Sequence, residues 1–147
     1  MIFIITSVIL SLDQLTKHLA AKNLSLNESY PVIKGIFHLT LLHNTGAAFG
    51  ILQDQSFLLT IAGFAGILLI LLFTFVISHR SPFLVTTAGK LALGLALGGT
   101  IGNLTDRLRF GQVTDFISVS IWPTFNIADS AVTIGIILFA YLFLLSN

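Results

Sequence analysis

The sequence predicts an all-α integral membrane protein, a four-transmembrane-helix bundle that carries a small β-containing loop platform. Three observations predict this fold. The 147 residues are 55% hydrophobic and only 9% charged, whereas an average soluble domain is about 25% charged. The apolar residues gather into four stretches, each near the roughly 20 residues that a helix needs to cross a bilayer. Two of the segments between them show the polar–apolar alternation of β-strands.

We assign the four apolar stretches to spans of one membrane-embedded domain, residues 1–147. The spans run over about residues 1–21, 56–78, 86–104 and 125–145. The first is interpreted as a span and not as a cleavable signal peptide, because no basic segment precedes it and no small-residue cleavage site follows it. In the third, Gly94, Gly98 and Gly102 recur every four residues, a spacing that lets a neighbouring helix approach closely. A tight exposed turn is predicted at residues 79–82.

The two long segments outside the spans are predicted to share one face of the membrane. Residues 35–43 and 112–120 alternate in polarity, which predicts short strands. The first and third loops of a four-span bundle lie on the same side. The face with these loops carries more Lys and Arg than the other face. Taken literally, the positive-inside rule would place the loops in the cytoplasm. We do not treat this charge count as decisive for the orientation.

Charge and cysteine content exclude several classes of function. The formal net charge is +1, so the composition indicates neither a nucleic-acid partner nor an acidic substrate. The chain has no cysteine, which excludes disulfides and thiolate sites. The histidines lack metal-ligand spacing. No metal site is therefore expected.

Acidic residues supply the strongest functional signal. Those predicted to lie at one end of the bundle are Asp13, Asp106, Asp115 and Asp129. An ionisable residue in or beside a membrane segment indicates function unless a cation pairs with it. Asp106 adjoins Arg107, and Asp13 lies one helical turn before Lys17, an arrangement that forms ion pairs.

Asp115 and Asp129 have no such neighbour. Asp129 lies three residues after Asn126, which can cap the fourth span, and no Lys or Arg follows Arg109. Asp115 lies within the second strand segment. If the two carboxylates meet, they share a proton, because like charges in contact raise one pKa and lower the other. One would act as general base on water while the other polarises a peptide carbonyl. This is aspartyl peptide hydrolysis, but spacing alone leaves open whether the two carboxylates meet.

Two more asparagines begin short polar motifs. Asn44 opens a small glycine-containing turn, and Asn103 opens residues 103–107 at the end of the third span. Because an asparagine side chain both donates and accepts hydrogen bonds, each can bind a substrate backbone or only satisfy a turn.

Five motifs, taken together and in order, resemble those of the bacterial lipoprotein signal peptidases, the signal peptidase II family. The motifs are Asp13-Gln-Leu-Thr-Lys17, Asn44-Thr-Gly-Ala-Ala-Phe49, Gly98-Gly-Thr-Ile-Gly-Asn-Leu-Thr-Asp-Arg107, Val113-Thr-Asp-Phe116 and Phe125-Asn-Ile-Ala-Asp129. The resemblance covers nearly the whole chain. It implies a hydrolase, an aspartyl endopeptidase that needs no cofactor. Such an enzyme removes the signal peptide from prolipoproteins by cleaving before a diacylglyceryl-modified cysteine.

The resemblance also implies roles for single residues. Asp115 and Asp129 would form the catalytic dyad, the pair that the chemistry singles out. The residues implied to bind substrate or to support the site are Asp13, Lys17, Asn44, Gly46, Asn103, Asp106, Arg107 and Asn126.

The resemblance further implies a multi-pass protein of the bacterial inner membrane, with cytoplasmic termini and an active site near the outer leaflet. We prefer this orientation to the charge count, because Lys17 and Arg107 lie within the motifs themselves. The expected partners are a prolipoprotein with a lipid-modified cysteine and membrane lipids, with no nucleic acid, and the chain is expected to act as a monomer. The first loop is expected to lie on the membrane surface and to close over the site; its apolar residues are Phe37, Leu39, Leu41 and Phe49.

Two other functions use buried acids in a helical bundle. A small transporter would use them as a relay, spread through the depth of the membrane, whereas here they cluster at one end. A non-catalytic scaffold would pair them with Lys17 and Arg107, which leaves Asp129 unexplained.

Overall fold

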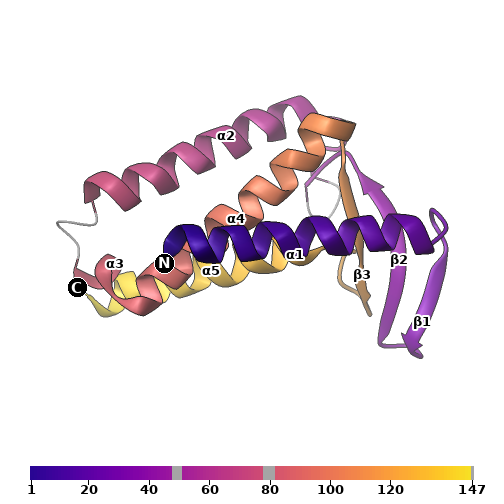
Figure 1. Cartoon of the computed structure of the whole chain (residues 1–147). Coiled ribbons are helices and arrows are strands. Elements are labelled where there is room, and N and C mark those ends of the chain that lie inside the picture. Colours follow the sequence, from indigo (N-terminus) through magenta and orange to yellow (C-terminus); the bar gives the residue numbers. More distant parts are fainter. Residues whose placement is uncertain (48–50, 78–81, 147) are drawn as a thin grey trace.

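The protein is mostly helical, with a small sheet at one end of the helices. The computed structural model describes residues 1–47, 51–77 and 82–146. The long helices are α1 (Ile2–Asn23), α2 (Ser56–Leu72), α4 (Thr87–Phe110) and α5 (Ile127–Leu145). A π-helical segment, η2 (Phe73–Ile77), continues α2, and a short helix, α3 (Pro82–Val85), precedes α4. Both termini lie at the end of the helices that is remote from the sheet (Figure 1).

Three helices within the described residues are long and apolar enough to cross a membrane. They are α1, α5 and the continuous helix Ser56–Val76. The fourth predicted span corresponds to α4, which has 24 residues but is rich in glycine and carries charged residues in its last turns. A membrane protein with a small sheet is therefore confirmed, whereas hydropathy supports three of the four predicted spans.

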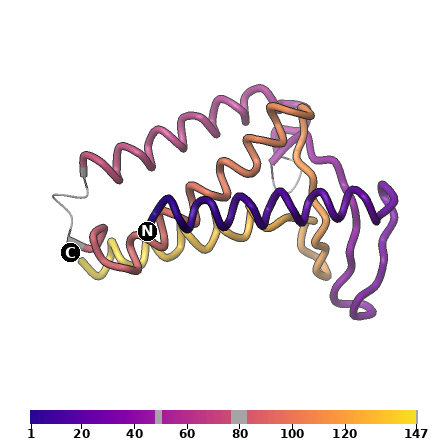
Figure 2. Tube along the Cα trace, in the orientation of Figure 1, coloured from indigo at the N-terminus to yellow at the C-terminus, as the bar shows by residue number. Residues whose placement is uncertain are grey.

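Helix α4 lies at the centre of the bundle, where it packs against α1, α2 and α5. Its glycines make this packing close. A Cβ atom added at Gly94 would lie 2.8 Å from the Cβ of Ile5, and one at Gly102 would lie 2.5 Å from a carboxylate oxygen of Asp13 and 3.3 Å from the Cβ of Ala128. Only glycine allows α1 and α5 to approach α4 this closely, which supports the structural interpretation of the four-residue spacing. In Figure 2 α1 and α5 run alongside each other, whereas α4 runs obliquely to both, toward the start of α2.

The sheet is antiparallel, with the strand order β1 (Ser29–Ile33), β2 (Phe37–Asn44) and β3 (Val113–Val119). Both predicted strand segments are confirmed, as β2 and β3. Strand β1 escaped prediction because it contains Pro31 and is exposed along its whole length, so no alternation marks it. In the β2–β3 register Leu42 pairs with Asp115 and Asn44 pairs with Val113. This places Asn44 diagonally opposite Asp115 on one face.

One expectation about the first loop is wrong. Leu41 does not lie on a membrane surface: it is buried against Ala20 of α1 and Phe116 of β3, and Leu39 packs on the same cluster. The reason is that β2 is the central strand, and one of its faces covers the end of α1. The exposed apolar residues of the sheet are instead at the β1–β2 hairpin, namely Tyr30, Val32, Ile33 and Ile36. Phe49 and most of the predicted turn at 79–82 lie outside the described residues.

Candidate active site

A cavity of about 480 Å³ lies where α4, β3 and the start of α5 meet. Asp115 and Asp129 both line it, so the structure brings together the two carboxylates whose meeting the sequence leaves open. The other predicted site residues in its wall are Asn44, Gly46, Asn103 and Arg107, and its apolar lining includes Val113, Trp122, Phe125, Val132 and Ile134. Sequence reasoning missed this apolar wall. For the wall residues on α5, the available signal was their helical spacing from Asp129.

Asp129 lies in the first turn of α5, where two N–H groups hold its carboxylate. Asn103 Nδ2 donates to Oδ1 at 2.7 Å, and the backbone nitrogen of Asn126 donates to Oδ2 at 3.2 Å. The Asn126 side chain accepts in return from the Asp129 backbone nitrogen at 2.9 Å. These reciprocal bonds form a capping box, a motif that satisfies the free N–H groups at a helix start. The carboxylate of Asp129 is therefore fixed in orientation at the start of α5, a helix end that attracts negative charge.

Asp115 is only 2% exposed and accepts from two side-chain amides. Asn44 Nδ2 donates to Oδ2 at 2.8 Å, and Asn126 Nδ2 donates to Oδ1 at 2.7 Å. Burial, reinforced by the nearby charge of Asp129, raises the pKa of Asp115 to about 7, although the two amides oppose the rise. Asn126 therefore contacts both carboxylates, and the surroundings favour a proton on Asp115.

Both amides that serve Asp115 are fixed in orientation by a second hydrogen bond. The Oδ1 atom of Asn44 accepts from the Gly46 backbone nitrogen at 2.9 Å, and the Oδ1 atom of Asn126 accepts from Asp129, as described above. Since each amide oxygen already meets a donor, the amide nitrogen must face the carboxylate. The turn at Asn44 and the cap at Asn126 are thus local structures that also orient the site.

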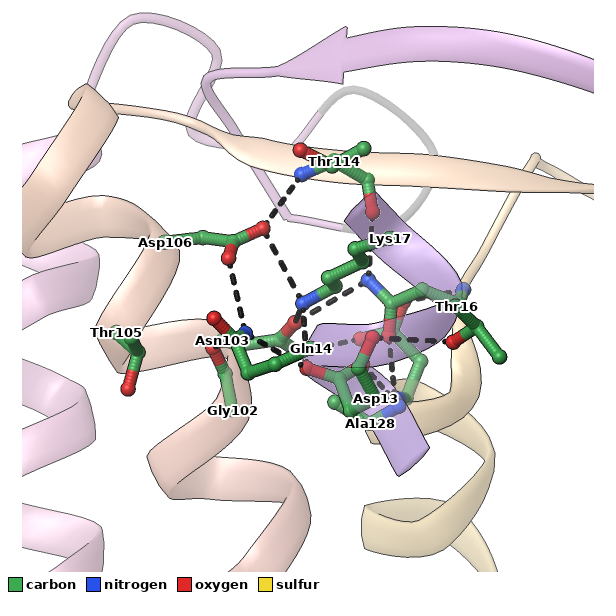
Figure 3. Close-up of polar contacts among 12 residues, drawn as sticks. Asp13, Gln14, Thr16, Lys17, Gly102, Asn103, Thr105, Asp106, Thr114 and Ala128 are labelled. Carbon is green, nitrogen blue, oxygen red and sulfur yellow. Dashed lines mark hydrogen bonds and ion pairs between the residues drawn. The ribbon is translucent and has the colours of Figure 1, made fainter. Parts of the chain in front are cut away.

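Asp13 and Asp106, the other two acids predicted at this end of the bundle, form a separate buried cluster around Lys17 (Figure 3). Lys17 Nζ lies 2.9 Å from Asp13 and 3.3 Å from Asp106. The ion pair between Asp13 and Lys17, expected from their spacing, is confirmed. Gln14, which sequence reasoning overlooked although it lies inside the first motif, donates to both carboxylates at 3.1 Å.

The expected pairing of Asp106 with Arg107 is wrong. In the described part of the chain both ion pairs are made by Lys17, and Arg107 instead donates from Nη2 to the Gly46 carbonyl oxygen at 3.1 Å. Adjacent residues of an α-helix point about 100° apart. Asp106 therefore faces α1, while Arg107 faces the cavity. The Arg107 Nε atom is buried without a hydrogen-bond partner among the described residues.

This placement bears on the alternative functions. Asp115 and Asp129 belong to no ion pair between described residues, so pairing with cations, as in a scaffold, does not account for them. All four acids lie near the sheet end of the helices and not along their length, unlike a transport relay. In the described ranges, no group of three His, Asp or Glu side chains could hold a metal ion.

Comparisons with known proteins agree on one family. The family model for signal peptidase (SPase) II matches residues 5–145. A lipoprotein signal peptidase of Halothermothrix orenii is 42% identical over 135 residues, which are 92% of this chain and 89% of that protein. One from Dehalococcoides mccartyi is 47% identical over 135 residues, 92% of this chain and 83% of its own.

Solved structures show the same similarity in three dimensions. Two structures described as a bacterial membrane enzyme have TM-scores of 0.87 and 0.84 to this chain at 31% identity. They cover 97% and 99% of this chain and 87% and 94% of their own. Since the match spans almost the whole chain, the chain belongs to the signal peptidase II family and is a peptidase.

Proposed function

We propose that Asp115 and Asp129 are the catalytic dyad of this peptidase, and that it cleaves before a diacylglyceryl-modified cysteine. As a member of its family, the chain removes signal peptides from prolipoproteins. One observation carries the dyad assignment: two carboxylates line one cavity, and a single residue, Asn126, donates to both, from its backbone nitrogen to Asp129 and from its side-chain nitrogen to Asp115.

The proton positions define a hydrolysis mechanism. Ionised Asp129 takes a proton from water, whose oxygen attacks the carbonyl carbon of the scissile peptide, while protonated Asp115 donates to the carbonyl oxygen. The resulting intermediate carries two hydroxyl groups on the former carbonyl carbon. As the C–N bond breaks, Asp129 gives its proton to the leaving nitrogen and Asp115 takes one from a hydroxyl. Both carboxyl groups then have their initial protonation, so the cycle balances.

The surrounding polar groups support these steps. Asn44 and Asn126 donate to Asp115 and stabilise it when it becomes ionised in the intermediate. The buried and unpartnered Nε of Arg107 offers an N–H group to a carbonyl oxygen of the substrate backbone. The other predicted supports, Asp13, Lys17 and Asp106, lie behind the cavity wall.

We further propose that α4 is the fourth span of one membrane-embedded domain over residues 1–147. At a rise of 1.5 Å per residue, its 24 residues extend about 36 Å, enough to cross the roughly 30 Å hydrocarbon core. Four spans place both termini on one side, which agrees with their common position in Figure 1. We assign that side to the cytoplasm of a bacterial cell and the site to the outer leaflet of its inner membrane.

The exposed surface supports contact with lipid. Helix α2 has no buried residue, and the hairpin residues Tyr30, Val32, Ile33 and Ile36 present apolar side chains. In this arrangement a monomer takes the signal peptide sideways from the bilayer, and the diacylglyceryl chains stay in lipid beside the bundle.

The test is cleavage of a synthetic precursor peptide that carries a diacylglyceryl-cysteine, by the purified protein in lipid. We expect Asp115→Asn and Asp129→Asn to remain folded and to abolish cleavage. Glu28→Gln is the matched control, because it makes the same acid-to-amide change on an exposed residue outside the cavity. Wild-type cleavage by either aspartate variant would refute the dyad. Equal cleavage of the same peptide without the lipid would refute the substrate class.

A further inference from the structure

Lys17 is buried, with only 4% of its surface exposed, and it does not line the cavity. Its Nζ atom has three oxygen partners: Asp13 at 2.9 Å, Asp106 at 3.3 Å and Asn103 Oδ1 at 3.0 Å. An ammonium group has three N–H bonds and accepts none, so its donors are fully used. Figure 3 shows the Lys17 ammonium among these groups.

The contact with Lys17 determines how the Asn103 amide is oriented. Because an ammonium group only donates, it must meet the amide oxygen, and Asn126 Nδ2 donates to the same oxygen at 3.2 Å. The Asn103 nitrogen consequently faces the cavity and donates to Asp129 at 2.7 Å. A rotated amide would direct its oxygen at the carboxylate and its N–H groups at the ammonium, so both contacts would become repulsive.

The two carboxylates paired with Lys17 hold the backbone beside the dyad. Asp13 Oδ1 accepts from the backbone nitrogen of Ala128 at 3.0 Å, and Asp106 Oδ2 accepts from that of Thr114 at 2.9 Å. Ala128 directly precedes Asp129, and Thr114 directly precedes Asp115. Lys17 therefore pairs with both carboxylates, Asp13 and Asp106, that hold the backbone of α5 and of β3 next to the dyad.

We propose that Lys17 is a positioning residue of the dyad. Through Asn103 it directs an N–H group at Asp129. Through Asp13 and Asp106 it holds the backbone just before each of the two catalytic aspartates. This inference rests on the dyad assignment proposed above. Lys17 itself contacts neither substrate nor water in the reaction. Its effect is to keep the carboxylate of Asp129 hydrogen-bonded and aimed into the cavity.

A change in pH dependence follows from this role. Five charged groups of the elements around Asp129 lie in the cavity or in the Lys17 cluster behind it, namely Asp13 and Lys17 of α1, Asp106 and Arg107 of α4, and Asp115 of β3. The other charged side chains of α1 and α4, Lys22, Lys90 and Arg109, belong to neither group. Without the ammonium, the Asn103 oxygen keeps only its contact with Asn126, so the amide is held less firmly in the orientation that donates an N–H group to Asp129. A carboxylate that loses a donor to its charged form binds a proton more readily. The acidic limb of kcat/KM should therefore move to higher pH.

The test uses two Lys17 variants. Lys17→Met leaves two buried carboxylates without a cation, which can prevent folding. The double variant Lys17→Met/Asp106→Asn keeps the net charge of the cluster, and its new amide oxygen can still accept from Thr114. We expect the double variant to fold and to lose about 10- to 100-fold in kcat, the effect of one hydrogen bond to a charged group. KM should stay within about twofold, and the acidic limb should rise by about one pH unit.

The controls separate positioning from support of the fold. Lys22→Met removes an exposed lysine of the same helix and should behave as wild type. A folded double variant with wild-type kcat and pH profile would overturn the proposal. If neither Lys17 variant folds, Asn103→Leu carries the test with both ion pairs in place: a displaced acidic limb supports the proposal, and an unchanged one overturns it. Asp129→Asn is assayed in parallel, because residual cleavage there would overturn the dyad itself.

Discussion

The buried carboxyl group of Asp115 makes the stability of the protein depend on pH. Its pKa is raised from the ordinary 3.8 to about 7, first by burial and then by the charge of Asp129. In the unfolded chain the group loses its proton near pH 4, whereas in the folded protein it keeps the proton until about pH 7. Between these values the folded state binds more protons, so stability falls as pH rises. Below pH 4 and above about pH 7 this contribution is constant.

The size of the effect follows from the shift in pKa. A shift of about three pH units, at about 1.4 kcal/mol per unit, amounts to roughly 4 kcal/mol between pH 4 and pH 7. Asp115→Asn removes the ionisable group and leaves an amide of nearly the same shape. The new amide nitrogen meets one of the two N–H donors, from Asn44 or Asn126, a cost that does not depend on pH. Relative to wild type, the stability of this variant should therefore be higher at pH 8 than at pH 4.5, by roughly 4 kcal/mol.

The assay is thermal unfolding of both proteins in one detergent at several pH values, together with kcat/KM for wild type. The difference in melting temperature should grow from pH 4.5 to pH 7 and then level off. Cleavage should decline as pH rises through about 7, because Asp115 then loses the proton that it gives to the carbonyl oxygen. A pH-independent difference in melting temperature, with full activity at pH 9, would refute a protonated Asp115.

Two further predictions concern packing and capping. Gly94→Ala should lower the melting temperature, because its Cβ would lie 2.8 Å from that of Ile5 and overpacking costs about 1–3 kcal/mol. The control is Gly66→Ala, whose new Cβ has its nearest contact at 3.8 Å and which should be neutral or stabilising. Equal melting temperatures of the two variants would contradict the close α1–α4 contact. Asn126→Ala should cost about 0.5–2 kcal/mol of cap stability and nearly all cleavage. Thr86→Ala removes the cap of α4 and should lower the stability but not the cleavage rate. A comparable loss of cleavage in the Thr86 and Asn126 variants would show that Asn126 acts only as a cap.

Local patterns predicted the elements whose burial is regular along the chain. Strand β3 alternates because one face covers the end of α1, and the long helices are apolar because they pack together or meet lipid. Strand β1 left no such pattern: it is exposed throughout and forms by pairing with the edge of β2. Leu41 was misplaced for a related reason, since alternation identifies a strand but does not say which face the rest of the protein covers.

The candidate site shows the same division. The motifs placed Asn44, Asn103 and Asn126 near the dyad, but they could not say which way each amide points. That depends on the groups bound to the amide oxygens: a turn nitrogen for Asn44, a helix N–H for Asn126 and Lys17 for Asn103. Likewise, adjacency suggested Arg107 as the partner of Asp106, whereas helix geometry turns the two side chains to different sides.

The sequence by itself determined the membrane class and singled out Asp115 and Asp129 as acids without a neighbouring cation, because hydropathy and the spacing of charges are properties of the chain alone. Only the tertiary structure decided that the two carboxylates line one cavity, that Asn126 contacts both and that Lys17 joins Asp13 to Asp106. Such contacts connect residues as far apart in sequence as Asp13 and Ala128, which are separated by 115 positions. They exist because glycines let α1 and α5 pack closely against α4. The four-residue spacing of these glycines indicates close packing, but it does not say which helices approach or which side chains then meet.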